Sequence, residues 1–156
     1  MTHVRTQLRN ALANTALASL KPETGDGEIY ASRYRPVTNY PSIIVFNGNE
    51  RTDTENPGYI NTSEADKRYR RFQDFVIEIA VEQSENADTA LDDLCELVEA
   101  AVAADEQIVN AIIAIDMIGT TFTGSTGQGT DQLHIAQLTY RVEYRTGATA
   151  PDTALA

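Results

Sequence analysis

The chain has 156 residues and a formal net charge of -11, and this negative charge argues against nucleic-acid binding over the whole surface. Its length fits one domain. The composition, with 42 % hydrophobic and 22 % charged residues, excludes global disorder and a fibrous repeat. No apolar run reaches the ~20 residues that cross a bilayer, so no membrane contact is expected, and one cysteine with two histidines is too few for a disulfide or a zinc site.

The first part of the chain predicts one helix and two strands. Apolar residues recur at helical spacing over 3–20, where Thr2 is able to cap the helix and Lys21-Pro22 ends it. The segments "IYAS" at 29–32 and "PSIIVFN" at 41–47 follow as strands, joined by the turn "RYRPVTNYP". Residues 47–67 contain many turn-forming residues and no periodicity, which predicts a long exposed loop.

The second part predicts three more strands and one helix. Apolar residues alternate from Phe75 to Val81, which indicates a strand at 69–82. Asn86 is expected to cap a helix whose apolar stripe runs from Leu91 to Val102. Strands at 110–122 and 132–146 form a hairpin around "TGSTGQGTD", and residues 148–156 predict a flexible C-terminal tail.

These elements predict an α+β fold in a single domain over residues 1–147. Their order is α-β-β-β-α-β-β, and most strands follow one another without a crossover helix between them. Such an order favours a mainly antiparallel β-sheet with two helices packed on one face.

Catalytic and metal-binding patterns are incomplete in this sequence. "GSTGQG" has the glycines of a phosphate loop but lacks Lys-Ser/Thr, and a strand follows it where a helix is required. "NGNERTDTE" resembles a calcium loop, yet Arg51 occupies the place of an oxygen ligand. His134 is interpreted as a surface histidine, because no candidate nucleophile is near it in the sequence. We therefore expect no enzyme activity and no cofactor.

Charge is divided unevenly along the chain, and the basic residues of the first part are the candidate interface. Segment 82–106 contains nine carboxylates and no basic residue, which is typical of a solvated helix face or of a surface for a basic partner. Arginine interleaved with tyrosine is typical of single-strand nucleic-acid platforms and of protein interfaces, and the net charge favours an interface. The candidate interface residues are Arg33, Tyr34, Arg35, Tyr40, Arg51, Arg68, Arg70 and Arg71.

Five short sequence segments, spread over residues 3–147, resemble a known family when they are taken together and in order. They are "HVRTQLRNALA", "IYASRYRP" followed by "YPSIIVF", "FVIEIAVE", "ALDDLCELVEAAV" and "AQLTYRVEYRTG". In order and spacing they resemble the tail terminator proteins of long-tailed bacteriophages, the minor tail protein U-like group, also called tail completion proteins. The chain departs from that pattern in the polar segment 47–67 and after Gly147.

The resemblance implies a structural virion protein and no catalysis. Proteins of this group assemble as a hexameric ring on the tail tube, end its polymerisation and form the surface that the head joins. The implied partners are further copies of the chain, the tail tube protein and head-tail connector or neck proteins, with DNA only as cargo through the lumen. The implied location is the virion at the head-tail junction, and the host cytoplasm during assembly.

Other hypotheses stay open at this point. A neck or head-completion adaptor would have the same small α+β composition. A small nucleic-acid-binding module would use the Arg and Tyr cluster, and a hydrolase would use the carboxylate-rich helix.

Overall fold

The computed structural model describes residues 2–21, 28–32, 39–55, 67–105, 108, 112–124 and 133–155. Its strands form one sheet in the order β1-β2-β3-β5-β4, with β6 pairing to β5. The bounds are β1 Glu28–Tyr30, β2 Ser42–Thr54, β3 Arg68–Glu82, β4 Ala114–Gly124, β5 Leu133–Gly147 and β6 Ala154–Leu155. Strand β1 pairs parallel to β2 and all other pairs are antiparallel.

The N-terminal helical run matches the predicted span and varies in its hydrogen bonding. It consists of α1 (Val4–Ala11), a π-helical segment (Leu12–Ala16) and a 3-10 segment (Leu17–Leu20). The helix is capped by His3, whose Nδ1 accepts a hydrogen bond from the Arg5 backbone N–H at 3.2 Å. The predicted cap at Thr2 is therefore wrong by one residue.

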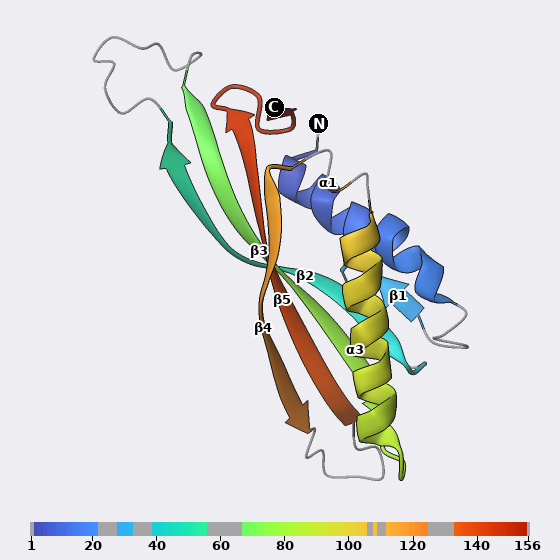
Figure 1. The fold of residues 1–156 in the computed structure, drawn as a ribbon. Coiled ribbons are helices and arrows are strands. Elements are labelled where there is room, and N and C mark those ends of the chain that lie inside the picture. Colours follow the sequence, from blue (N-terminus) through green and yellow to red (C-terminus); the bar gives the residue numbers. More distant parts are fainter. Residues whose placement is uncertain are drawn as a thin grey trace.

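The second helix, α3 (Ala87–Ala104), lies on the same face of the sheet as α1 (Figure 1). Asn86 occupies the N-cap position as predicted, but its side chain makes no capping hydrogen bond. Both helices share one hydrophobic cluster with alternate residues of β2, β3 and β5. The α+β class, the element order and the two-layer arrangement are thus as the sequence predicts.

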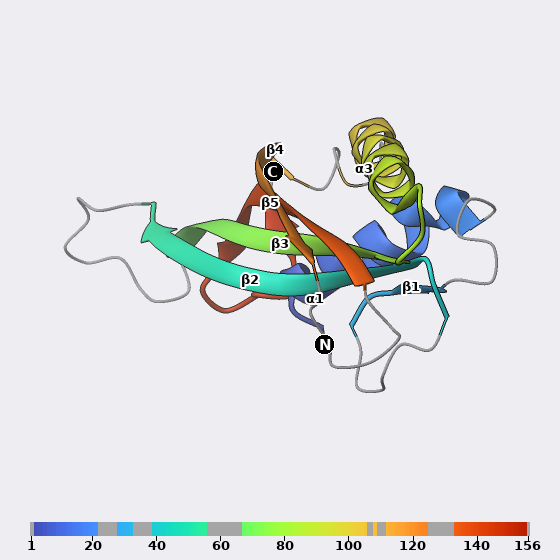
Figure 2. The same ribbon diagram turned by 90° about the horizontal axis from the view of Figure 1, so that it is seen from below.

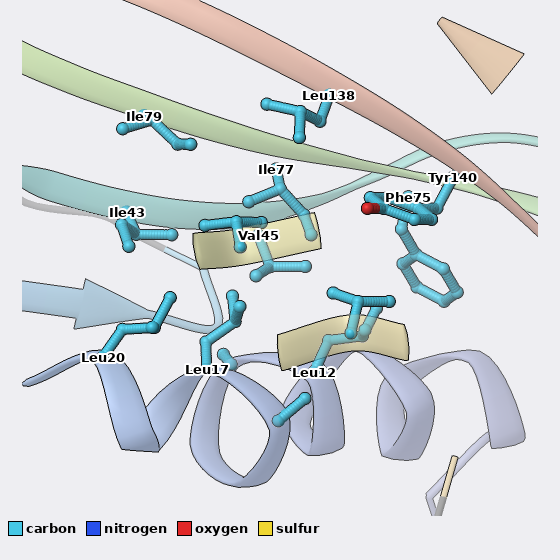
Figure 3. Packing of buried hydrophobic residues seen from close by; sticks show 14 of the residues in the cluster. Leu12, Leu17, Leu20, Ile43, Val45, Phe75, Ile77, Ile79, Leu138 and Tyr140 are labelled. Atoms are coloured by element: carbon cyan, nitrogen blue, oxygen red, sulfur yellow. The ribbon is translucent and has the colours of Figure 1, made fainter. Parts of the chain in front are cut away.

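The core lies between the helices and the central strands. Leu12, Leu17 and Leu20 of the N-terminal helical run face the sheet (Figure 3). Each such buried aliphatic side chain stabilises the fold by roughly 1.5–3 kcal/mol. The sheet residues opposite them in this cluster are Ile43, Val45, Phe75, Ile77, Ile79, Leu138 and Tyr140.

Strand β2 is longer than predicted, so the loop prediction at 47–67 is wrong for its first part. The chain remains in the strand to Thr54 and pairs with β3 from Glu50 to Thr54 after an irregularity between Asn47 and Glu50. A Cβ on Gly48 would lie 3.1 Å from Asp74 Cβ, so glycine allows the close approach of the two strands. Polar residues suit this part of β2 because the distal ends of β2 and β3 extend beyond the helices (Figures 1 and 2). Residues 56–66 lie outside the described residues.

The C-terminal segment is docked, which corrects the predicted flexible tail at 148–156. The backbone N–H of Val4 donates to Pro151 O at 3.1 Å, and Gln7 Nε2 donates to Asp152 O at 2.8 Å. Because the first N–H groups of a helix lack partners within the helix, the Pro151 carbonyl satisfies one of them in α1. Ala154 then pairs with Thr146 of β5, and residue 156 lies outside the described part.

None of the helices in the described ranges is long and apolar enough to cross a membrane.

Candidate functional site

A polar cluster centred on Glu50 closes the helix side of the sheet where the apolar core ends. Glu50 Oε1 accepts hydrogen bonds from Arg71 Nη1 at 2.7 Å and from Arg5 Nη1 at 3.4 Å. Its other oxygen, Oε2, accepts from the Tyr144 hydroxyl at 2.8 Å. Burial, followed by this hydrogen bond, raises the pKa of Tyr144 well above its ordinary value. One carboxylate therefore joins α1, β2, β3 and β5.

Neighbouring polar groups complete this cluster. Arg71 Nε donates to Thr146 Oγ1 at 2.9 Å, and the Arg71 side chain is only 13 % exposed. Gln73, which is buried, donates from Nε2 to Asp74 O at 2.7 Å and to Gly48 O at 3.2 Å. These bonds hold the irregular part of β2 against β3. Arg71, predicted as an interface residue, thus has its guanidinium turned into the fold.

Five arginines lie on the opposite side of the same strands, and we call this surface the arginine face. The register places Arg70 opposite Arg145 and Asp74 opposite Arg141, on the side of β3 that the helices do not cover. Arg51 lies over the Phe72 ring at 4.4 Å and Arg70 at 5.2 Å from the ring centre. The arginine face consists of Arg51, Arg68, Arg70, Arg141 and Arg145.

Carboxylates pair with four of these arginines and lie deeper than their partners. Arg70 Nε donates to Glu143 at 2.5 Å, and the side chains are 43 % and 13 % exposed, respectively. Arg141 makes two bonds to Asp74, at 2.8 and 3.1 Å, with 47 % and 14 % exposure. The same order of exposure holds for the two remaining pairs, Arg51–Asp53 and Arg145–Glu55. Within each pair the guanidinium group is therefore the more exposed partner, and Arg51 at 68 % is the most exposed of these paired side chains.

A second surface is formed by β4, which is the last strand of the sheet on its side. Its pairing with β5 is irregular between Met117 and Gly119. An exposed apolar edge strand is a template for contact with another chain. Three large apolar residues of β4, together with Ile113 directly before the strand, are 43–58 % exposed, and we call them the β4 strip: Ile113, Met117, Ile118 and Phe122.

Helix α3 is acidic beside this strip. Asp88 Oδ1 lies 3.0 Å from His134 Nδ1, which places the start of α3 against β5. His134 also hydrogen-bonds Gln83, so this histidine, interpreted from sequence as a surface residue, joins the two ends of the β3–α3 connection. Burial, followed by the charge of Glu99, raises the pKa of Tyr140 to about 12, which places Glu99 near β5 as well. Asp88, Asp92 and Glu99 share this side of α3, and we call them the acidic wall.

The structure places the predicted interface residues in several different environments. Arg51, Arg68 and Arg70 come together on the arginine face, whereas Arg71 belongs to the Glu50 cluster. Tyr40 precedes β2 and lies far along that strand from Arg51. The other three, Arg33, Tyr34 and Arg35, lie outside the described residues.

Sequence reasoning missed Glu50, the β4 strip, and two members of the arginine face, Arg141 and Arg145. The alternation of residues 137–145 already placed Arg141 and Arg145 on one polar face, so they were open to prediction. Glu50 offered no comparable signal, because its partners Arg5 and Tyr144 are remote in the sequence.

Within the described ranges, no group of three or more His, Cys, Asp or Glu side chains is placed to hold a metal ion. No protein-family model matches this chain, and no curated protein matches it.

Proposed function

We propose that this protein is a structural assembly subunit, a tail terminator of a long-tailed bacteriophage. In this role it caps the tail tube, ends tube polymerisation and forms the head-joining surface as a hexameric ring. The family resemblance of the five sequence segments supports this function. Among the structural observations, the exposed apolar β4 strip on an edge strand carries the proposal, because a ring subunit needs such a surface for its neighbour.

The arrangement of charge also supports assembly. The arginine face lies on β2, β3 and β5 on the side of the sheet that the helices do not cover, whereas the acidic wall lies on α3, on the opposite side of the sheet (Figures 1 and 2). Two unlike surfaces on one chain favour head-to-tail contacts, and such contacts close into rings or extend as filaments.

A neck or head-completion adaptor is the alternative within the virion. It would use the same two surfaces on different partners. Nucleic-acid binding is favoured by one observation: the guanidinium groups of Arg51 and Arg70 stack on the Phe72 ring, on the exposed side of the sheet. The carboxylates beneath those arginines and the net charge of -11 oppose it.

The deciding experiment is the oligomeric state of the purified protein with and without tail tube protein. Light scattering after size exclusion, followed by negative-stain microscopy, is expected to reveal closed six-fold rings and to show that adding the protein stops tube growth. A monomer at high concentration that leaves tube growth unchanged would overturn the proposal. Rings that bind portal-side proteins and leave tube growth unchanged would point to the adaptor.

A further inference from the structure

The β4 strip and the acidic wall form one composite surface. Met117 pairs in register with Tyr140, and the charge of Glu99 acts on that same tyrosine. Farther along, Gly124 pairs with His134, which contacts Asp88. Two positions along β5 thus link β4 to the same side of α3. Apolar side chains of the edge strand therefore lie beside a row of carboxylates.

The arginine face has the matching chemistry. Its centre is the Phe72 ring, with the Arg51 and Arg70 guanidinium groups stacked against it. Each guanidinium carries five N–H donors, and the bond from Arg70 to Glu143 uses only its Nε. An aromatic group surrounded by guanidinium groups is suited to an apolar strip that is bordered by carboxylates.

We propose that the arginine face of one copy docks onto the β4 strip and acidic wall of the next copy. This inference rests on the proposed function, because it specifies the contact that builds the ring. The two surfaces are complementary in charge and lie on opposite sides of the sheet, so a molecule cannot join them internally. Each subunit instead uses one surface on each neighbour, which is a heterologous contact.

A second copy is favoured over a different basic protein because both halves of the contact are present on this chain. It is also favoured over nucleic acid, since Glu143 and Asp74 beneath the arginines reduce the attraction of this face for phosphates, and the net charge of -11 repels them. An isologous contact of β4 with β4 would bring two acidic walls together, and like charges oppose that arrangement.

The test uses charge reversal at exposed positions of the full chain. The wall variant is Asp92→Lys with Glu99→Lys, and the face variant is Arg51→Glu with Arg68→Glu. Each alone is expected to weaken self-association by at least about tenfold in sedimentation velocity. A chain with all four changes has the two charges exchanged and is expected to regain assembly, which also demonstrates that the substitutions leave the fold intact.

Mixing the two variants gives a further prediction. The intact arginine face of the wall variant docks onto the intact wall of the face variant. The Lys-bearing wall of the first then meets the Glu-bearing face of the second, so the mixture is expected to assemble with the two variants alternating. The matched control is Asp93→Lys with Glu96→Lys, which makes the same charge change on another side of α3 and is expected to assemble as the unchanged protein does.

The apolar part of the contact is tested with a chain that carries Met117→Ser and Phe122→Ser. This chain is expected to self-associate more weakly than the unchanged protein.

The outcomes separate this inference from the proposed function. Rings that persist in both the wall and the face variants would overturn the inference and leave the ring function standing. If the face variant still forms rings but no longer binds DNA that the unchanged protein binds, the arginine face is assigned to nucleic acid. That result would overturn the inference as well. An unchanged protein that forms no ring, with or without tube protein, would overturn the proposed function itself.

Discussion

Tyr144 and Glu50 are joined by a 2.8 Å hydrogen bond from the tyrosine hydroxyl to Glu50 Oε2, which spans from β5 to β2 above the intervening β3. The same carboxylate accepts hydrogen bonds from Arg71 and Arg5. The polar end of the core therefore depends on one side chain, while the apolar remainder is distributed over many.

Replacing Glu50 with Gln is expected to lower the free energy of unfolding by about 2–4 kcal/mol, because Arg71 would keep a largely buried charge without its partner. Urea denaturation followed by circular dichroism measures this loss. The control is Asp53→Asn in the same strand, where both members of the Arg51–Asp53 pair are exposed and a change below about 1 kcal/mol is expected. Equal stability of the two variants would contradict the structural role of Glu50.

His3 is expected to make stability sensitive to mild acid. Burial, with the charges of Arg5 and Arg71, lowers the pKa of His3 below its ordinary value. A lowered pKa means that the neutral imidazole contributes stability above the unfolded-state pKa of about 6.5, and that this contribution is lost as pH falls through the folded-state pKa. Protonation would also remove the Nδ1 acceptor for the Arg5 N–H.

The variant His3→Asn tests this expectation, since asparagine caps helices well and does not titrate. The free energies of unfolding of the two proteins are compared between pH 5 and 8. The unchanged protein is expected to lose stability relative to the variant below about pH 6.5. Parallel curves over this range would refute the effect.

Cys95 is expected to be unreactive in the folded protein and to give an alkaline limit to stability. Burial, then the charges of Asp92 and Glu99, raises the pKa of the thiol to about 11. Because the folded pKa is raised, the contribution is complete below the unfolded-state pKa and is lost as pH rises through about 11. At pH 8 a disulfide reagent should react roughly 100-fold faster in urea than in buffer. Equal rates would contradict burial of the thiol, and Cys95→Ala should remove its share of the alkaline loss.

Truncation after Gly147 is expected to destabilise the protein by about 1–3 kcal/mol, because Val4 and Gln7 lose their bonds to Pro151 and Asp152. Thermal melting of the truncated chain measures the change. Truncation after Thr153 keeps both carbonyl groups and removes only β6, so a smaller loss is expected. If the two truncations are indistinguishable from the full chain, the docked position of the C-terminal segment is incorrect.

The elements that sequence patterns predicted well are those that bury one face. Alternation from Phe75 to Val81 and the stripe from Leu91 to Val102 each encode a buried surface, and both became regular elements in the core. The polar part of β2 has no such signal, because its strand state depends on backbone pairing with β3. The docked C-terminal segment is held in part by hydrogen bonds to its backbone carbonyl groups. Every residue has such a group, so these bonds leave no signal in the sequence.

The candidate surfaces were predictable only in part, for a related reason. The concentration of arginine was visible in the sequence, but Arg70 meets Glu143 only through the register of β3 with β5. The alternation of side chains along β3 turns Arg71 to the core side and Arg70 outward, but the meeting of Arg71 with Glu50 depends on the pairing of β2 with β3. Which member of an ion pair lies deeper follows from packing and has no counterpart in residue order.

The deeper position of the carboxylates on the arginine face changes how far that surface acts. Each carboxylate cancels most of the field of its arginine within a few ångströms, so the surface exerts little attraction at the Debye length of about 8 Å in physiological salt. Long-range capture of an oppositely charged molecule is therefore weak, and recognition depends on a partner whose shape reaches the guanidinium edges. The contact that we propose with a second copy therefore depends on fit at short range.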